Sequence, residues 1–369
     1  MVHNQPPASS ELLSEADRQL LRDSVREFLA SRWPSAQAVE RSGDPEAIAA
    51  LWRDMSAQSL TSLGADSAEG GLREIALVFE ELGRAGCPAP MLGAITAHLA
   101  LGPKRETSQA AAALLADIAA GQARVAVAYG VFDGDASAGR VDVAGQGETL
   151  ALEGRVAFVE SSAGATHFLV FTDQPAGAVL VAADAPGVEV QQTPGLAVPA
   201  LAEVFFRRAA GKRVGLDTAD IEDVVQAGRL ACAARALGAA HRAFELAVEH
   251  AKVRKQFGQF IGQFQAIQHK LADGLTSLDG VRLALEQAAA ERDRGERQWT
   301  LFASAALAFT GPALRSLAVQ VHRALGAIGY AEEHEAPRHF RRVHADLVRF
   351  GGTRRARSEL SDFLLGPAA

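Results

Sequence analysis

One stretch of the chain, residues 217–253, constrains the fold more than any other. Asp217 or Thr218 can cap a helix there, and its middle (AGRLACAARALGAAHRAFELAV) is small or apolar on nearly every face. A helix of this kind must be buried among other helices. Helical patterns follow at about 264–294, 298–325 and 344–365, and Gly311-Pro312 is expected to interrupt or kink the second of these. The sequence therefore predicts a C-terminal helical bundle over residues 213–369.

The N-terminal part also shows helical periodicity. We predict an N-terminal helical domain over residues 1–122, after a disordered tail at Met1–Ser10. Glu80 and Glu81 are expected on a solvated helix face. The predicted helices are Leu12 to Pro34, with Ser10 or Ser14 as the cap, then Ala47–Met55, Glu74–Gly86 and Ala110–Ala120.

The hydrophobic period changes at Arg124. From there to about residue 212, short β-branched and aromatic runs alternate with turns of Gly, Asp and Pro. Runs this close together favour antiparallel strands in a sandwich or barrel over βαβ units. The predicted fold class is therefore α+β and mostly α, with a central antiparallel β-domain at 123–212 between the two helical domains.

Charge and composition exclude several classes of function. The net charge of -7 gives no electrostatic basis for binding nucleic acid or an anionic membrane. Cys87 and Cys232 lack metal-ligand spacing and are expected to be buried thiols in a reducing compartment. The N-terminus has no secretory h-region, and we expect no run long and apolar enough to span a bilayer. These features predict a cytoplasmic protein.

The segment after the long helix carries chemical information. Arg254 and Lys255 precede a Gln-Phe-Gly turn, and a helix with Phe264 and Gln265 follows. Arg254 could hold a phosphate with two parallel hydrogen bonds, Phe257 could lie against a flat ring, and Gln265 could reach its polar edge. Without a ligand, the two cations could simply complement the helix dipole.

The whole segment resembles the Arg-x-x-Phe-Gly turn and Phe-Gln-x-x-Gln-x-x-Leu-Ala-Asp helix of the acyl-CoA dehydrogenase family. Later, Leu325-Gly-Ala-Ile-Gly-Tyr330 resembles the family's Gln-x-x-Gly-Gly motif, with Arg323 at the Gln position and Ala327 at the second Gly. The resemblance implies that FAD is the cofactor and that these segments bind the FAD of a neighbouring subunit. The residues implied in cofactor binding are Arg254, Gln256, Phe257, Phe264, Gln265, Arg323 and Gly326.

The segments that cover the flavin ring in this family are only partly present. Where the family has Thr-Glu and Gly-Ser-Asp, the chain reads Tyr129-Gly-Val-Phe-Asp-Gly-Asp. The next segment is retained, and the resemblance places Phe158 and Ser161 against the ring, although Phe158 could equally be an inward-facing strand residue. The loss of the first segment argues against a complete isoalloxazine site within this chain.

Dehydrogenation of an acyl-CoA needs a carboxylate to remove the α-proton, and its absence costs on the order of a hundredfold to ten-thousandfold. The family places this Glu at one of two positions, which are Gly351 and Gly228 here. Arg229 matches a family Arg near the substrate, or it forms a buried ion pair with Glu222 or Asp223. Glu332, Glu333 and Glu335 are poor substitutes for the base and are expected to form a solvated cluster facing Arg338, Arg341 and Arg342.

The resemblance therefore suggests a subunit of a heteromeric acyl-CoA dehydrogenase of the steroid type that lacks the catalytic Glu. The implied partners are a homologous subunit that carries the Glu, an acyl-CoA substrate and an electron-transferring flavoprotein. Three alternatives remain: a homotetrameric dehydrogenase with another base, a flavin-dependent monooxygenase or oxidase on the same fold, and a scaffold that binds no flavin.

Overall fold

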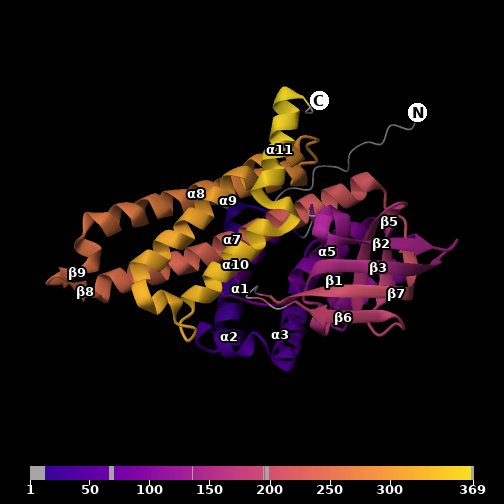
Figure 1. Cartoon of the computed structure of the whole chain (residues 1–369), viewed down its shortest axis with the longest axis horizontal. Coiled ribbons are helices and arrows are strands. Elements are labelled where there is room, and N and C mark those ends of the chain that lie inside the picture. Colours follow the sequence, from indigo (N-terminus) through magenta and orange to yellow (C-terminus); the bar gives the residue numbers. More distant parts are fainter. Residues whose placement is uncertain (1–12, 66–69, 135, 194, 196–198, 367–369) are drawn as a thin grey trace.

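The N-terminal part of the chain is a layer of helices, as predicted. The structure is a computed structural model that describes residues 13–65, 70–134, 136–193, 195 and 199–366 (Figure 1). The predicted tail at Met1–Ser10 therefore lies outside the described residues. Ser14 caps the first helix by accepting a hydrogen bond from the backbone N–H of Asp17, which confirms one of the two predicted caps. The helices are α1 (Glu15–Arg32), α2 (Ser35–Arg41), α3 (Pro45–Ala57), α4 (Leu72–Arg84), α5 (Met91–Leu101) and α6 (Gln109–Ala119).

Two of these helices were not predicted. Helix α2 is short, and α5 is buried on nearly all sides, so α5 lacks the polar face that marks an amphipathic helix. The prediction for Glu80 and Glu81 was wrong, because both side chains are buried. Glu80 accepts hydrogen bonds from Arg22 and Arg282, and Glu81 accepts from Arg22 and Arg26.

Helices α4 and α7 (Thr218–Val253) touch through their backbones. A Cβ atom at Gly238 would collide with the carbonyl oxygen of Glu80, and one at Gly83 would collide with the carbonyl oxygen of Arg235. Only glycine permits this approach. The contact explains why the acidic face of α4 lies inside the molecule and needs arginine partners.

The central domain is a seven-stranded sheet with the order β1-β4-β5-β7-β3-β2, in which β6 also pairs with β7. Among the described strands of this sheet, all pairs are antiparallel except β1 and β4, which are parallel, so the prediction of a purely antiparallel domain was wrong for one pair. The β2–β3 hairpin separates β1 from β4 in sequence and gives the chain the length to return in the same direction. The strands are β1 (Val125–Ala128), β2 (Gly139–Ala144), β3 (Thr149–Glu160), β4 (His167–Asp173), β5 (Ala176–Ala182), β6 (Val188–Gln192) and β7 (Leu201–Val214).

Both faces of the inner strands are buried. Val125, Val127 and Leu169 pack with the helices, while Ala126 and Phe168 pack in a separate core that the sheet encloses itself. Because side chains alternate along a strand, the sheet is fixed between the helices and its own outer strands. Cys87 and Cys232 are buried, as predicted.

The C-terminal part is the predicted helical bundle. Helix α7 is 36 residues long, begins at the cap Asp217, and reaches from the sheet to the opposite end of the molecule, where β8 (Lys255–Gln256) and β9 (Gln259–Phe260) form a small hairpin (Figure 1). Then come α8 (Gln265–Asp293) and α9 (Trp299–Leu325), close to their predicted bounds. Helix α9 continues through Pro312, so of the two predicted alternatives an interruption was wrong and a kink stays a prediction.

The last predicted helix, 344–365, is in fact two. Helix α10 (Ala336–Val348) ends in a turn at Arg349–Gly351, and α11 (Gly352–Leu365) follows. The break comes from three successive residues with positive φ: Phe350 (54°), Gly351 (76°) and Gly352 (52°).

One segment of the bundle is long and apolar enough to cross a membrane by length and composition alone, which corrects the expectation of none. It is Trp299–Tyr330, and half of its most apolar window is buried inside the protein. A core helix of a helical bundle passes the same test, so this is weak evidence for a membrane span.

Candidate functional site

The hairpin after α7 is held open to solvent at the far end of the bundle. Phe257 is 94% exposed, and its ring meets that of Phe264 edge to face, with ring centroids 6.2 Å apart. Phe257 (φ 50°) and Gly258 (φ 83°) form the two-residue turn between β8 and β9, and positive φ at both central positions is the pattern of a type I′ turn. A bulky residue held in this conformation and left in solvent is unfavourable on both counts.

The other predicted cofactor residues lie at the same end. A Cβ at Gly274 would meet Leu317, and one at Gly280 would meet Phe309, so α8 and α9 run antiparallel. This register places Gln265, the first residue of α8, beside Arg323 and Gly326 at the end of α9. Arg254, Gln256, Gln265, Arg323 and Gly326 are all exposed, and Phe264 is half-buried.

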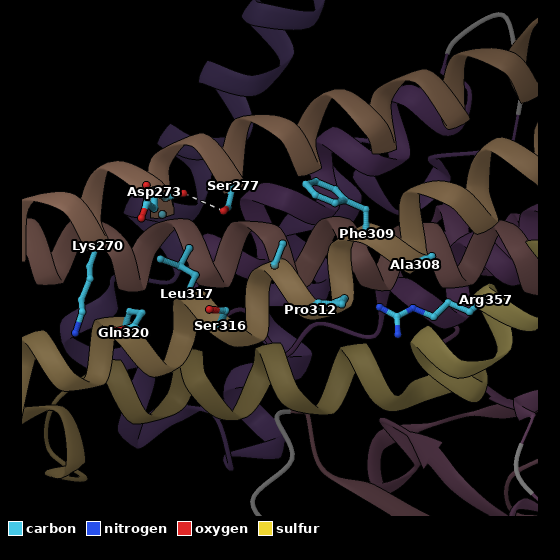
Figure 2. Close-up of a pocket in the computed structure, with 12 residues that line it drawn as sticks. Lys270, Asp273, Ser277, Ala308, Phe309, Pro312, Ser316, Leu317, Gln320 and Arg357 are labelled. Atoms are coloured by element: carbon cyan, nitrogen blue, oxygen red, sulfur yellow. Dashed lines mark hydrogen bonds between the residues drawn. The ribbon is translucent and has the colours of Figure 1, made fainter.

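A surface groove of about 560 Å³ continues from this end along α8, α9 and α11. Figure 2 shows Lys270 and Gln320 at one end of the groove and Arg357 at the other, with Phe309 and Pro312 between them. The missing N–H of Pro312 leaves the carbonyl of Ala308, which also lines the groove, without its usual helical donor. The groove therefore has a cation at each end, with Asp273 also lining it near Lys270, and a partly apolar middle.

Each of the two positions expected for the base lies next to one member of a pair of aromatic rings, because Gly228 faces Tyr129 and Gly351 directly follows Phe350. Phe350 and Tyr129 meet edge to face with centroids 4.7 Å apart, and the Tyr129 hydroxyl lies 2.9 Å from the Thr96 hydroxyl. A Cβ at Gly228 would lie 3.5 Å from that Tyr129 hydroxyl, and a Cβ at Gly351 would lie 2.7 Å from the Cβ of Arg355. A side chain at Gly228 would therefore meet Tyr129, and one at Gly351 would meet Arg355.

The cavities at this place are small. One, next to Arg229, Arg349 and Phe350, measures about 20 Å³, and another, next to Tyr129, Glu160 and Ser161, measures about 10 Å³. Each holds about one water molecule, whereas ligand sites for cofactors or drug-sized molecules usually measure about 300–1,000 Å³. Phe158 and Ser161 both adopt positive φ, at 61° and 58°, where β3 bulges against β7 and then ends.

A network of buried charges joins the sheet to the bundle beside these cavities. Arg235, on α7, donates to both oxygens of Glu160 at 2.7 and 2.8 Å and to both oxygens of Asp346 at 2.9 and 2.6 Å. Arg349 lies 3.4 Å from Glu160 and 3.5 Å from Asp133. Burial alone would raise the pKa of Glu160, but Arg235 and Arg349 hold it at about 2. The carboxylate is therefore a charged structural group and is unsuited to accept a proton from a substrate near neutral pH.

Arg229 is buried and paired, but its partner was predicted wrongly. It donates to Glu359 at 2.9 and 3.0 Å and also contacts Gln226, whereas Asp223 accepts from Arg292 and Trp299. Helix α11 supplies Glu359, and sequence distance hid this contact. Burial lowers the pKa of Arg229, and Glu359 partly offsets that effect.

The acidic cluster after α9 only partly faces the arginines predicted for it. Arg341 pairs with the exposed Glu332 at 2.9 Å, as expected. Glu335 instead pairs with Arg242 at 2.7 Å and His339 at 3.4 Å. Arg338 and Arg342 turn inward and donate to the carbonyl oxygens of Gly86 and Cys87, so the prediction was wrong for these two.

The sequence interpretation missed the buried network. Arg235 stands among small and apolar residues of α7, as Arg229 does, and a charged residue in such a helix signals a buried partner. Its partners could not be found from spacing, because Glu160 and Asp346 come from distant segments of the chain.

Known proteins resemble the chain over nearly its whole length. The family models for the acyl-CoA dehydrogenase N-terminal and C-terminal domains match residues 15–131 and 219–361. The acyl-CoA dehydrogenase IpdE2 of Mycolicibacterium smegmatis is 28% identical over 92% of this chain and 96% of its own length.

Two solved structures have a closely similar fold. The ChsE4-ChsE5 complex from Mycobacterium tuberculosis contains a chain 25% identical, with a TM-score of 0.83 over 97% of this chain and 100% of that one. A single-residue variant of the steroid acyl-CoA dehydrogenase Tcur3481-Tcur3483 is 26% identical, with a TM-score of 0.83 over 95% of this chain and 98% of that one. With both family models matched in order and the fold shared throughout, the chain belongs to the acyl-CoA dehydrogenases, a family of FAD-dependent oxidoreductases that act on CoA thioesters.

Proposed function

We propose that this chain is one subunit of a heteromeric acyl-CoA dehydrogenase, and that it supports α,β-dehydrogenation by holding the FAD of a partner subunit. The partner is a homologous chain that carries the catalytic Glu. The observation that carries the proposal is the contrast between the exposed, preformed hairpin at Arg254–Phe260 and the two glycines, Gly228 and Gly351, at the positions of the base.

The exposed end of the bundle has the groups that this role needs. Arg254 offers a fork of donors for a phosphate, and the first turn of α8 has no side-chain cap, so its N–H groups are available to an anion. Phe257 offers a ring face to stack on, and Gln265 and Arg323 are exposed at the same end of the bundle. The exposure of these side chains supports a role in binding a ligand held by another subunit.

The interior residues give less direct support for the substrate that we propose. Arg229, predicted to face the substrate, is occupied by Glu359, so in this chain it stabilises the α7–α11 contact. The similar Tcur3481-Tcur3483 steroid dehydrogenase supports a bulky CoA ester, such as a steroid side chain, as the substrate of the assembly. An electron-transferring flavoprotein is the electron acceptor that we propose.

The decisive experiment co-purifies this chain with a homologous subunit that carries the Glu and measures FAD per pair and dehydrogenation of an acyl-CoA. Loss of a charge-assisted hydrogen bond costs about 1.5–3 kcal/mol, so Arg254→Ala should weaken FAD binding by roughly 10- to 100-fold. The matched control is Arg297→Ala, which removes an exposed arginine at the opposite end of α8. Equal FAD retention in both variants would refute the role in trans, and dehydrogenation by this chain alone would favour a self-sufficient enzyme.

A further inference from the structure

We infer that an ionic lock closes the place that the family gives to the flavin ring, so that this chain holds no ring inside itself. The lock consists of Glu160 at the end of β3, Arg235 on α7, Asp346 on α10, and Arg349 with Asp133 beside them. Resemblance puts the ring against the end of β3, and Glu160 lies in sequence between Phe158 and Ser161, the two residues matched to ring contacts.

The lock ties together the parts of the molecule between which a ring would have to lie. Glu160 and Asp133 belong to the sheet domain, whereas Arg235, Asp346 and Arg349 belong to the bundle. Arg235 holds both oxygens of Glu160 with one edge of its guanidinium and also reaches Asp346, so four of its five N–H donors are committed. A planar ligand entering here would have to break these bonds in a buried setting.

The charges of the lock balance without a ligand. Three carboxylates, Glu160, Asp346 and Asp133, face Arg235 and Arg349, and the fully buried Arg342 adds a third positive charge nearby. A buried site that awaits an anion usually keeps a charge in reserve, whereas here three carboxylates face three guanidiniums and the formal charges cancel. The hydrogen bonding is less complete, because Nε and Nη2 of Arg349 and Nε and Nη1 of Arg342 are buried without a hydrogen-bond partner among the described residues.

The remaining space beside the lock is filled by aromatic rings. Tyr129 packs against Phe350 and Phe171, and two cavities beside these rings measure about 20 and 10 Å³. The backbone N–H of Phe350 donates to Asp133 at 2.7 Å, which joins the aromatic filling to the ionic part. The lock and the aromatic pair therefore close the same space from two sides.

Lumiflavin, the bare flavin ring without a phosphate or adenosine tail, tests this directly. The chain is used in a Phe257→Ala background, so that the exposed aromatic of the hairpin cannot stack on the probe. The closed chain should give no saturable quenching of lumiflavin fluorescence at micromolar concentrations. In the opened variant, Glu160→Thr is combined with Arg235→Ala, which leaves the net charge unchanged. This variant should bind one lumiflavin per chain saturably, at least tenfold more tightly than the closed chain.

The matched control is Glu80→Thr with Arg282→Ala, which removes another interhelical ion pair away from this place and should not create binding. Saturable binding of one lumiflavin by the closed chain would overturn the inference, and so would a folded opened variant that binds none. If the opened variant does not fold, lumiflavin binding by the closed chain still tests the inference.

A second experiment compares melting temperatures. Arg235→Met alone should lower the melting temperature by several degrees more than Arg235→Met with Glu160→Gln, and equal losses would refute a lock.

The inference extends the proposed function, yet the two can fail separately. A chain that excludes lumiflavin but adds nothing to the partner's FAD content would refute the role in trans only. A chain that binds lumiflavin inside and still stabilises the partner's FAD through Arg254 would refute the lock only.

Discussion

The two regions that the family associates with flavin have opposite character in this chain. The hairpin at the end of α7 is exposed, strained and rich in groups that bind phosphate and aromatic rings, with Phe257 94% exposed at positive φ. The region between sheet and bundle is buried, with the carboxylates of Glu160 and Asp346 paired with Arg235. A ligand or partner would offset the cost of the exposed hairpin, whereas the charges of the buried region balance one another.

This difference separates residues kept for binding from residues kept for folding. Removing a group from the buried region should unfold the protein or weaken it without touching a partner's FAD. Removing a group from the hairpin should leave the fold unchanged and affect only the assembly. Four predictions test this division.

The largest effect is expected at the centre of the lock. Arg235→Met leaves Asp346 without its ion-pair partner and Glu160 with only the longer contact to Arg349, and should lower the free energy of unfolding by about 3–5 kcal/mol. Urea denaturation measures it. Arg84→Met is the control, because its pair with Glu245 is partly exposed and should cost about 1 kcal/mol or less. Similar losses of unfolding free energy in both variants would show that the buried ion pairs of Arg235 matter no more for stability than a partly exposed pair.

Acid should weaken the lock through Glu160. Its pKa is lowered from 4.5 to about 2 in the folded protein, so its contribution is fully present above about pH 4.5 and is lost as the pH falls towards 2. A shift of this size corresponds to roughly 3 kcal/mol. Arg235, Arg349, Arg342 and Asp346 face the carboxylate, and the arginines keep their charge throughout. The free energy of unfolding should therefore fall less steeply between pH 6 and pH 3.5 in Glu160→Gln, and parallel curves would contradict the assignment.

A side chain at the family's base position should be costly here. Gly351 has a φ of 76° and a Cβ there would lie 2.7 Å from Arg355, so Gly351→Ala should lower the free energy of unfolding by about 1–3 kcal/mol. Gly258→Ala, with the same sign of φ but open space around it, should cost less. For the same reason Gly351→Glu should not create dehydrogenation of an acyl-CoA by this chain alone, and detectable turnover would show that the interior is still a working site.

The smallest effect on stability is expected at the hairpin. Phe257→Asn replaces a strained, exposed ring by a residue that tolerates positive φ, so unfolding should change by no more than about 0.5 kcal/mol in either direction. The FAD content of the co-purified pair should nevertheless fall several-fold. A loss of stability with normal FAD content would show that Phe257 stabilises the fold and does not bind FAD. The proposed difference between the hairpin and the buried region would then be wrong.

The architecture could be predicted largely from local patterns. The all-round apolar middle of α7, the change of period at Arg124 and the cap at Ser14 each report on neighbouring residues, and each was confirmed. The exposed segment from Arg254 to Gln265 was found for the same reason, since its motif is contiguous. The parallel pairing of β1 with β4 and the break at Phe350 were missed because they depend on tertiary contacts.

The buried charges show what local sequence patterns could not predict. Glu80 and Glu81 look like a solvated pair until the glycine contact between α4 and α7 brings them inside. Arg235, Glu160 and Asp346 are separated by 75 and 111 positions in the sequence, and only the folded chain brings them together. Spacing could identify Arg235 as a buried charge, but it could not identify its partners.

The ion pairs of Arg235 hold helix α7 near its middle, so a tilt of the helix at this point would displace its C-terminal end. From Arg235 to Arg254 the helix rises about 28 Å, so a tilt of about 5° would move Arg254 by about 2.5 Å. That displacement is comparable to the length of a hydrogen bond and would detach a phosphate from the Arg254 guanidinium. The ion pairs in the middle of the helix thus determine the position of Arg254. Small changes in the core near Glu160 would displace the Arg254 side chain, although it lies nearly the width of a domain away.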